Sequence, residues 1–143
     1  MITENLFWAL PVLLAALLTS IITRQHRDKE RFDKAADIFR NRVLTELKGL
    51  YPVTQYWDKA TFQIISNSIT EIESAVEEFR FFVTRKAQFD TAIKEYCDYC
   101  KIISWEECAG WSMYPTMRKE GEVGPREKFN NIVKHLLSFA DRK

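Results

Sequence analysis

The chain has 143 residues, of which 46% are hydrophobic and 29% charged, a composition typical of one domain with a packed core. Four glycines and four prolines exclude a collagen-like chain and a proline-rich disordered one. The formal net charge of +1 lacks the basic excess of dedicated nucleic-acid-binding proteins, so we expect no nucleic-acid partner.

The first predicted element is a transmembrane helix. No charged residue occurs from Leu6 to Thr23, and these 18 residues span about 27 Å as a helix, close to the roughly 30 Å hydrocarbon thickness of a bilayer. Trp8 lies near one end, where an indole suits the headgroup region. We therefore assign residues 1–25 to a transmembrane anchor and residues 26–143 to a cytoplasmic helical domain.

Two other interpretations of this stretch stay open, a cleaved signal peptide and a buried core helix. A signal peptide needs a positively charged start, and the first five residues carry only Glu4 as a charged residue. The stretch is followed by a basic cluster that we expect to contact anionic lipid headgroups and to stay in the cytoplasm. The cluster comprises Arg24, Arg27, Lys29, Arg31 and Lys34. The predicted topology is a single pass through the inner membrane, with the N-terminus outside.

The next two stretches have the hydrophobic period of amphipathic helices. The first runs from about Arg27 to Leu50 and ends at Gly49 and Pro52; whether it continues the membrane helix stays open. The second begins at the capping residue Asp58 and has a heptad seam, which favours an antiparallel hairpin with the first. The apolar positions are Phe32, Ala35, Ala36, Phe39, Val43, Leu47 and Leu50 in the first stretch and Phe62, Ile65, Ile69, Ile72, Val76, Phe79 and Val83 in the second.

Three shorter helices complete the prediction. One covers about Phe89 to Cys100, a second begins at the capping box Ser104-x-x-Glu107, and the last begins at Pro125, a favoured first helical residue. A loop is expected over residues 112–124. We therefore predict an all-α fold, in which one N-terminal transmembrane helix is followed by a small cytoplasmic bundle of four to five helices.

The chain resembles a class of small, uncharacterised bacterial single-span membrane-anchored helical proteins. The resemblance covers most of residues 32–140 and lies in short motifs. They are Phe39-Arg40, Leu50-Tyr51-Pro52, Glu78-Phe79-Arg80, Phe89-Asp90, Glu95-Tyr96 and Leu136-Leu137-Ser138-Phe139-Ala140. It implies a bacterial inner-membrane location and no particular activity.

The sharpest chemical candidate is Cys97-x-x-Cys100 with Cys108, which could complete a four-ligand zinc site with His135. However, Cys97 and Cys100 lie on the apolar face of their helix, where buried core thiols are the more common occupants, and the second close ligand pair of a structural zinc motif is absent. An odd number of cysteines and the lack of an N-glycosylation sequon favour the reducing, cytosolic side. We expect no cofactor.

The sequence contains no phosphate-binding glycine loop, no His-Glu-x-x-His and no Gly-x-Ser-x-Gly. We therefore expect a non-enzymatic, membrane-anchored interaction or scaffold protein with a protein partner or a second copy of itself. The alternatives are a membrane-tethered thiol or zinc-binding protein and, more weakly, a small toxin-like or pore-forming protein. The predicted partner surface comprises Ile64, Phe81, Phe82, Trp105 and Trp111.

Overall fold

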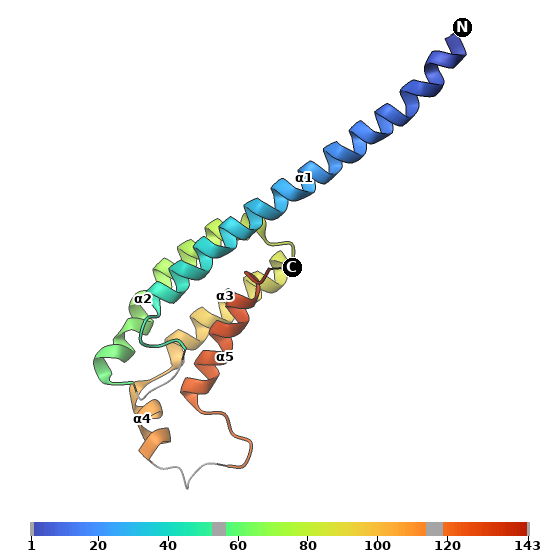
Figure 1. Ribbon diagram of the computed structural model, residues 1–143. Helices are drawn as coiled ribbons and strands as arrows, with labels where there is room; N and C mark the ends of the chain where they lie inside the picture. The colour runs from blue at the N-terminus through green and yellow to red at the C-terminus, as the bar shows by residue number, and fades with distance from the viewer. Residues whose placement is uncertain (1, 53–56, 114–118, 143) are drawn as a thin grey trace. The chain divides into compact units, whose positions relative to one another are not determined.

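The computed structural model describes residues 2–52, 57–113 and 119–142; at residues 2–6, 112 and 113 only the backbone is described (Figure 1). Within these ranges the chain is all-helical and contains no strand, which confirms the all-α part of the predicted fold. The elements are α1 (Ile2–Glu46), α2 (Lys59–Phe79), the short 3-10 helix η1 (Arg80–Phe82), α3 (Lys86–Ile102), α4 (Trp105–Met113) and α5 (Pro125–Ser138).

The chain forms two compact units, Met1–Lys34 and Ala35–Lys143, and α1 contributes to both. The apolar stretch and the amphipathic stretch that follows it therefore belong to one helix. α1 ends at Glu46, four residues before the predicted end at Leu50. Residues 47–50 form a turn instead, in which Gly49 has a φ of +91°, a conformation that favours glycine. We refer to the second compact unit as the helical unit.

In the helical unit, the last part of α1 runs antiparallel to α2. Phe39 stacks on Phe79 near the end of α2, with ring centroids 4.8 Å apart, whereas Gly49 lies near Thr61 at the beginning of α2. Arg42 joins the two helices between these points, because its guanidinium bonds Glu78 at 2.8 Å. The predicted antiparallel hairpin is therefore present within a single chain.

The α2–α3 and α3–α5 pairs are also antiparallel. Arg80 pairs with Asp90 at one end of α2 and α3, and the hydroxyls of Ser68 and Tyr96 meet further along. The ring of Tyr96 lies 6.1 Å from that of Phe129, near the beginning of α5. Four helical segments thus alternate in direction around one core, and α4 joins the end of α3 to the loop before α5 (Figure 1).

The buried faces largely follow the predicted periodicity. On α5 the apolar residues at helical spacing are all buried, namely Phe129, Ile132, Val133, Leu136 and Leu137, and so is Ala140 after the helix. On α2, Phe62 and Ile69 were expected in the heptad seam but are only half-buried, whereas the seam residues from Ile72 to Phe79 at the η1 end are buried. There, four packed rings form what we call the aromatic cluster: Phe39, Phe79, Phe89 and Phe139.

The predicted helix starts agree with the structure. The side chain of Asp58 accepts a hydrogen bond from the Thr61 amide at 2.6 Å, and the Ser104 hydroxyl accepts one from the Glu107 amide at 3.2 Å. Pro125 is the first residue of α5. The predicted loop begins later than expected, because α4 continues to Met113; residues 114–118 of that loop lie outside the described ranges.

Candidate functional site

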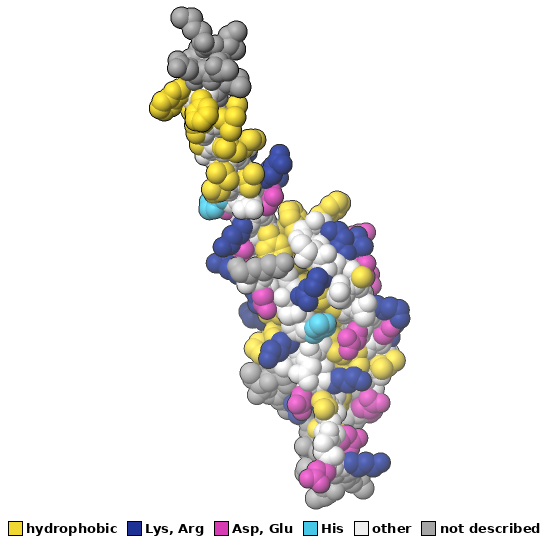
Figure 2. All heavy atoms as spheres, turned by 90° about the vertical axis from the view of Figure 1, so that its right-hand side faces the viewer, with side chains coloured by type: hydrophobic (Ala, Val, Ile, Leu, Met, Phe, Trp, Pro, Cys, Tyr) yellow, Lys and Arg dark blue, Asp and Glu magenta, His cyan; other side chains and the backbone are white. Residues whose placement is uncertain are grey.

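The apolar part of α1 is uncovered by any other part of the described chain. It is the one helix in the described ranges that is long and apolar enough to cross a membrane, and its most apolar window has no buried residue. Figure 2 shows hydrophobic side chains gathered along it. The exposed large side chains are Phe7, Trp8, Leu10, Val12, Leu13, Leu14, Leu17, Leu18, Ile21 and Ile22.

The hydroxyl groups in this stretch are satisfied inside the helix. Thr19 donates a hydrogen bond to the Ala15 carbonyl and Thr23 donates one to the Thr19 carbonyl, both at 2.8 Å. Hydrocarbon offers no hydrogen-bond partner, so a polar group in a membrane helix has to bond within the protein. These two residues meet that requirement without a neighbouring helix.

The five residues of the basic cluster are all exposed, so their charges are available to a surface outside the protein. Three acids, Asp28, Glu30 and Asp33, lie among them, which leaves a basic excess of two over residues 24–34. His26, which lies within this segment, is 3.0 Å from the Glu30 carboxylate.

The three cysteines of the helical unit form no disulfide, and all are buried. Burial raises the pKa of Cys97 to about 12, and that of Cys100 and of Cys108 to about 11. The Cys97 thiol also donates a hydrogen bond to the Glu73 carboxylate at 3.2 Å, which stabilises its protonated form. These thiols are therefore protonated at neutral pH, unlike activated nucleophiles.

The candidate zinc ligands do not converge. Among the residues that the structure describes, no three His, Cys, Asp or Glu side chains form a group suited to a metal ion. His135 is exposed on α5, and its ring packs against Phe139 at 5.4 Å instead of facing the cysteines. The structure thus does not bring Cys97, Cys100, Cys108 and His135 together.

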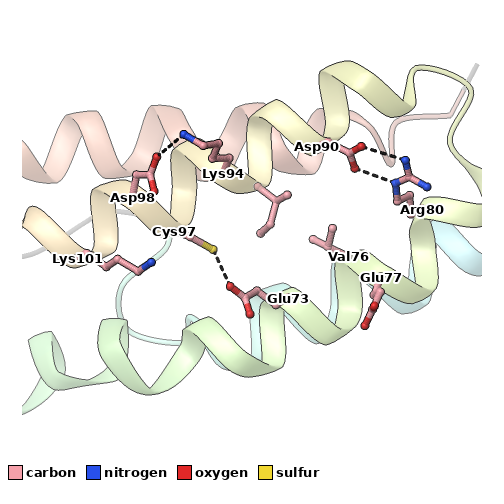
Figure 3. Close-up of a pocket in the computed structure, with 10 residues that line it drawn as sticks. Glu73, Val76, Glu77, Arg80, Asp90, Lys94, Cys97, Asp98 and Lys101 are labelled. Atoms are coloured by element: carbon pink, nitrogen blue, oxygen red, sulfur yellow. Dashed lines mark hydrogen bonds and ion pairs between the residues drawn. The ribbon is translucent and has the colours of Figure 1, made fainter.

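An open groove of about 410 Å³ lies between α2 and α3 (Figure 3). Val76 and Ile93 give it an apolar lining. Charged side chains from both helices surround this lining, and several are held in place by ion pairs, Arg80 with Asp90 and Lys94 with Asp98. The remaining lining residues are Glu73, Glu77, Cys97 and Lys101. The arrangement suits contact with a polypeptide that carries both apolar and charged side chains.

The five residues of the predicted partner surface lie in separate parts of the structure. Phe81 and Phe82 lie in η1, beyond the end of α2, and are 85% and 41% exposed. Ile64 lies in the first part of α2, so about 25 Å of helix separates it from Phe81. Trp105 and Trp111 are half-buried on α4, with the Lys59 ammonium 6.0 Å from the Trp105 ring. These five side chains do not form one continuous patch.

The groove was not anticipated from the sequence. The sequence contains part of the information about this groove, because Glu73 and Glu77 lie one turn apart on α2, and Lys94 and Asp98 lie one turn apart on α3. Which residues face each other, however, depends on the register between the two helices. Periodicity within one helix does not specify that register.

Comparisons with protein families, with curated proteins and with solved structures gave no match for this chain.

Proposed function

We propose that this chain is a single-span membrane protein without enzymatic activity, whose helical unit binds a partner protein at the cytoplasmic face of the inner membrane. The observation that carries the proposal is the uncovered apolar surface of α1, with ten exposed large apolar side chains. Burial of each from water is worth about 1.5–3 kcal/mol, so a bilayer stabilises this surface far better than water does.

The basic cluster supports the proposed orientation. Basic residues beside a membrane span are retained in the cytoplasm, and the anionic inner leaflet attracts them further. The cluster follows the apolar stretch directly, so the N-terminus would lie outside and the helical unit inside. The buried, free thiols also suit a reducing compartment.

The chemistry of the thiols supports a non-enzymatic function. A nucleophilic cysteine needs a lowered pKa in an accessible polar setting, whereas burial raises the pKa of all three cysteines here. The α2–α3 groove supports a binding function instead. Membrane confinement raises the effective concentration of two partners, so even a groove of this modest size would contribute to a useful affinity.

Alkaline extraction of membranes tests the anchor. The full chain is expected to stay in the membrane pellet at pH 11, while a Leu13→Lys/Leu17→Lys variant is expected in the supernatant. Each lysine near the middle of a span costs about 3 kcal/mol of insertion free energy. Ile102→Lys is the matched control, since Ile102 is exposed at the end of α3. Release of the unaltered chain would contradict the anchor.

Affinity purification from detergent-solubilised membranes tests partner binding. A Glu77→Lys/Lys94→Glu variant changes the charge pattern of the groove without altering its apolar lining. We expect it to lose a stoichiometric partner that the original chain retains. Lys134→Glu, an exposed change on α5, is the control and should retain the partner. Purification of the original chain as a lone monomer would contradict partner binding.

A further inference from the structure

The turn between α2 and α3 presents an unusual pair of side chains. Phe81 is 85% exposed, the most exposed large hydrophobic side chain in the described part of the chain, and its neighbour Phe82 is 41% exposed. Full burial of a phenylalanine side chain contributes about 1.5–3 kcal/mol of stabilising free energy. The exposed ring of Phe81 does not contribute this free energy in water. A surface that covers Phe81 would recover that free energy.

Hydrogen bonds on both sides of Phe81 support the conformation of the turn. Arg80 makes two hydrogen bonds to the Asp90 carboxylate, at 2.8 and 3.0 Å. The Lys86 ammonium bonds the Val83 carbonyl at 2.8 Å, and the Val83 side chain is buried. Phe81 therefore projects from a turn that these hydrogen bonds stabilise.

The turn itself carries basic side chains, and the acidic residues Glu77, Glu78 and Asp90 flank it on either side. Residues 79–89 contain Arg80, Arg85 and Lys86 and no Asp or Glu. Arg80 is paired with Asp90, but Arg85 and Lys86 are exposed. The Arg85 guanidinium lies 5.1 Å from the Phe139 ring, a contact that leaves its N–H groups able to bond phosphate oxygens.

The turn also lies at the end of the helical unit where α1 enters it. Phe39 stacks on Phe79 there, and Arg40 pairs with Asp141 at 2.9 Å. Only residues 24–34 separate this unit from the apolar stretch, about 17 Å of helix. About 5–8 Å of that distance lies within the headgroup region. These few residues limit how far the helical unit, and the turn with it, can move from a bilayer that the apolar stretch would span.

We propose that Phe81 and Phe82 insert into the headgroup region of an anionic bilayer, with Arg85 and Lys86 bound to lipid phosphates. The proposal rests on the single-span anchor proposed above. A lipid surface suits the α2–α3 turn better than a protein partner does. Two phenylalanines can bury at most about 300–500 Å² of surface, whereas a stable protein interface buries about 800 Å² on each side. Phenylalanine flanked by basic residues is also the composition of interfacial membrane anchors.

A fluorescent probe on the full chain tests the proposal. Phe81→Cys introduces an exposed thiol into a chain whose own three thiols are buried, and an NBD label there takes the place of the ring. The labelled chain is reconstituted into vesicles of phosphatidylcholine alone or mixed with phosphatidylglycerol. Ile102→Cys, 69% exposed at the far end of α3, carries the control label.

At position 81 we expect a blue-shifted NBD emission and loss of quenching by aqueous iodide in the anionic vesicles, and an aqueous spectrum at position 102. An added Arg85→Glu/Lys86→Glu change should return the label at position 81 to water. An aqueous spectrum at position 81 in both lipids would overturn the proposal. A blue shift that persists in lipid-free detergent and grows with protein concentration would also overturn the proposal, because a second copy of the chain would then cover Phe81. Failure of the chain to insert at all would instead count against the proposed anchor.

Discussion

Burial determines the behaviour of the titratable side chains at the centre of the helical unit. Cys97, Cys100 and Cys108 keep their protons well above neutral pH, and burial also raises the pKa of Tyr96 and, to about 12, that of Tyr99. The CxxC spacing suggested metal or redox chemistry, but its helical context predicted core thiols. Their buried positions agree with the second interpretation.

These shifts predict a stability that falls at alkaline pH. Because the folded-state pKa values of the thiols lie above the unfolded value of 9.0, the folded chain retains protons that the unfolded chain has released. The contribution is fully present below pH 9 and is lost as pH rises toward 11–12. Urea midpoints of the full chain in detergent, measured from pH 7 to 11, are expected to be flat and then to decrease. A midpoint that increases above pH 9 would contradict this.

A buried hydroxyl pair gives a second prediction at this scale. The Ser68 hydroxyl donates its proton to the Ile65 carbonyl at 2.7 Å, so the Tyr96 hydroxyl must donate to Ser68 across their 2.8 Å contact. Tyr96→Phe removes that donor and is expected to cost about 0.5–1.5 kcal/mol of unfolding free energy. Thermal unfolding followed by near-ultraviolet circular dichroism measures the loss. An unchanged melting temperature would show that the hydrogen bond contributes nothing net.

At the scale of elements, helix type and buried face were predictable because both follow from hydrophobic period. The capping residues Asp58 and Ser104 and the first-position Pro125 also marked helix starts correctly, since these signals are local. The end of α1 was predicted less well. An apolar residue such as Leu50 can be buried from a turn as readily as from a helix, so its burial does not show that the helix continues.

The α2–α3 turn yields a prediction about an ion pair. Arg80→Glu places two carboxylates together at Asp90 and is expected to loosen residues 80–90, whereas Arg80→Glu with Asp90→Arg restores an attractive pair. Hydrogen–deuterium exchange of the full chain measures the amides of this segment. Exchange should be faster in the single variant and close to the original in the double one. Equal exchange in all three would mean that Val83 and the aromatic cluster hold the turn without the pair.

At the scale of the whole molecule, the predicted partner surface shows the limit of sequence reasoning. Phe81 and Trp105 were predicted to share one partner surface, but the structure places them toward opposite ends of α2. Distance between side chains on different helices depends on packing, which one helical pattern does not encode. The apolar stretch of α1 was recognisable because its length and lack of charge are properties of a single continuous segment.

We propose that α1 crosses the membrane once and leaves the helical unit in the cytoplasm. A pair of reporters fused after Lys143 tests it most directly: a fluorescent protein that matures only inside the cell, and alkaline phosphatase, which is active only outside. Fluorescence without phosphatase activity is the predicted result. The Leu13→Lys/Leu17→Lys variant should keep the fluorescence but move it from the membrane to the soluble fraction. Phosphatase activity in the original chain would place the helical unit outside and contradict the proposed topology.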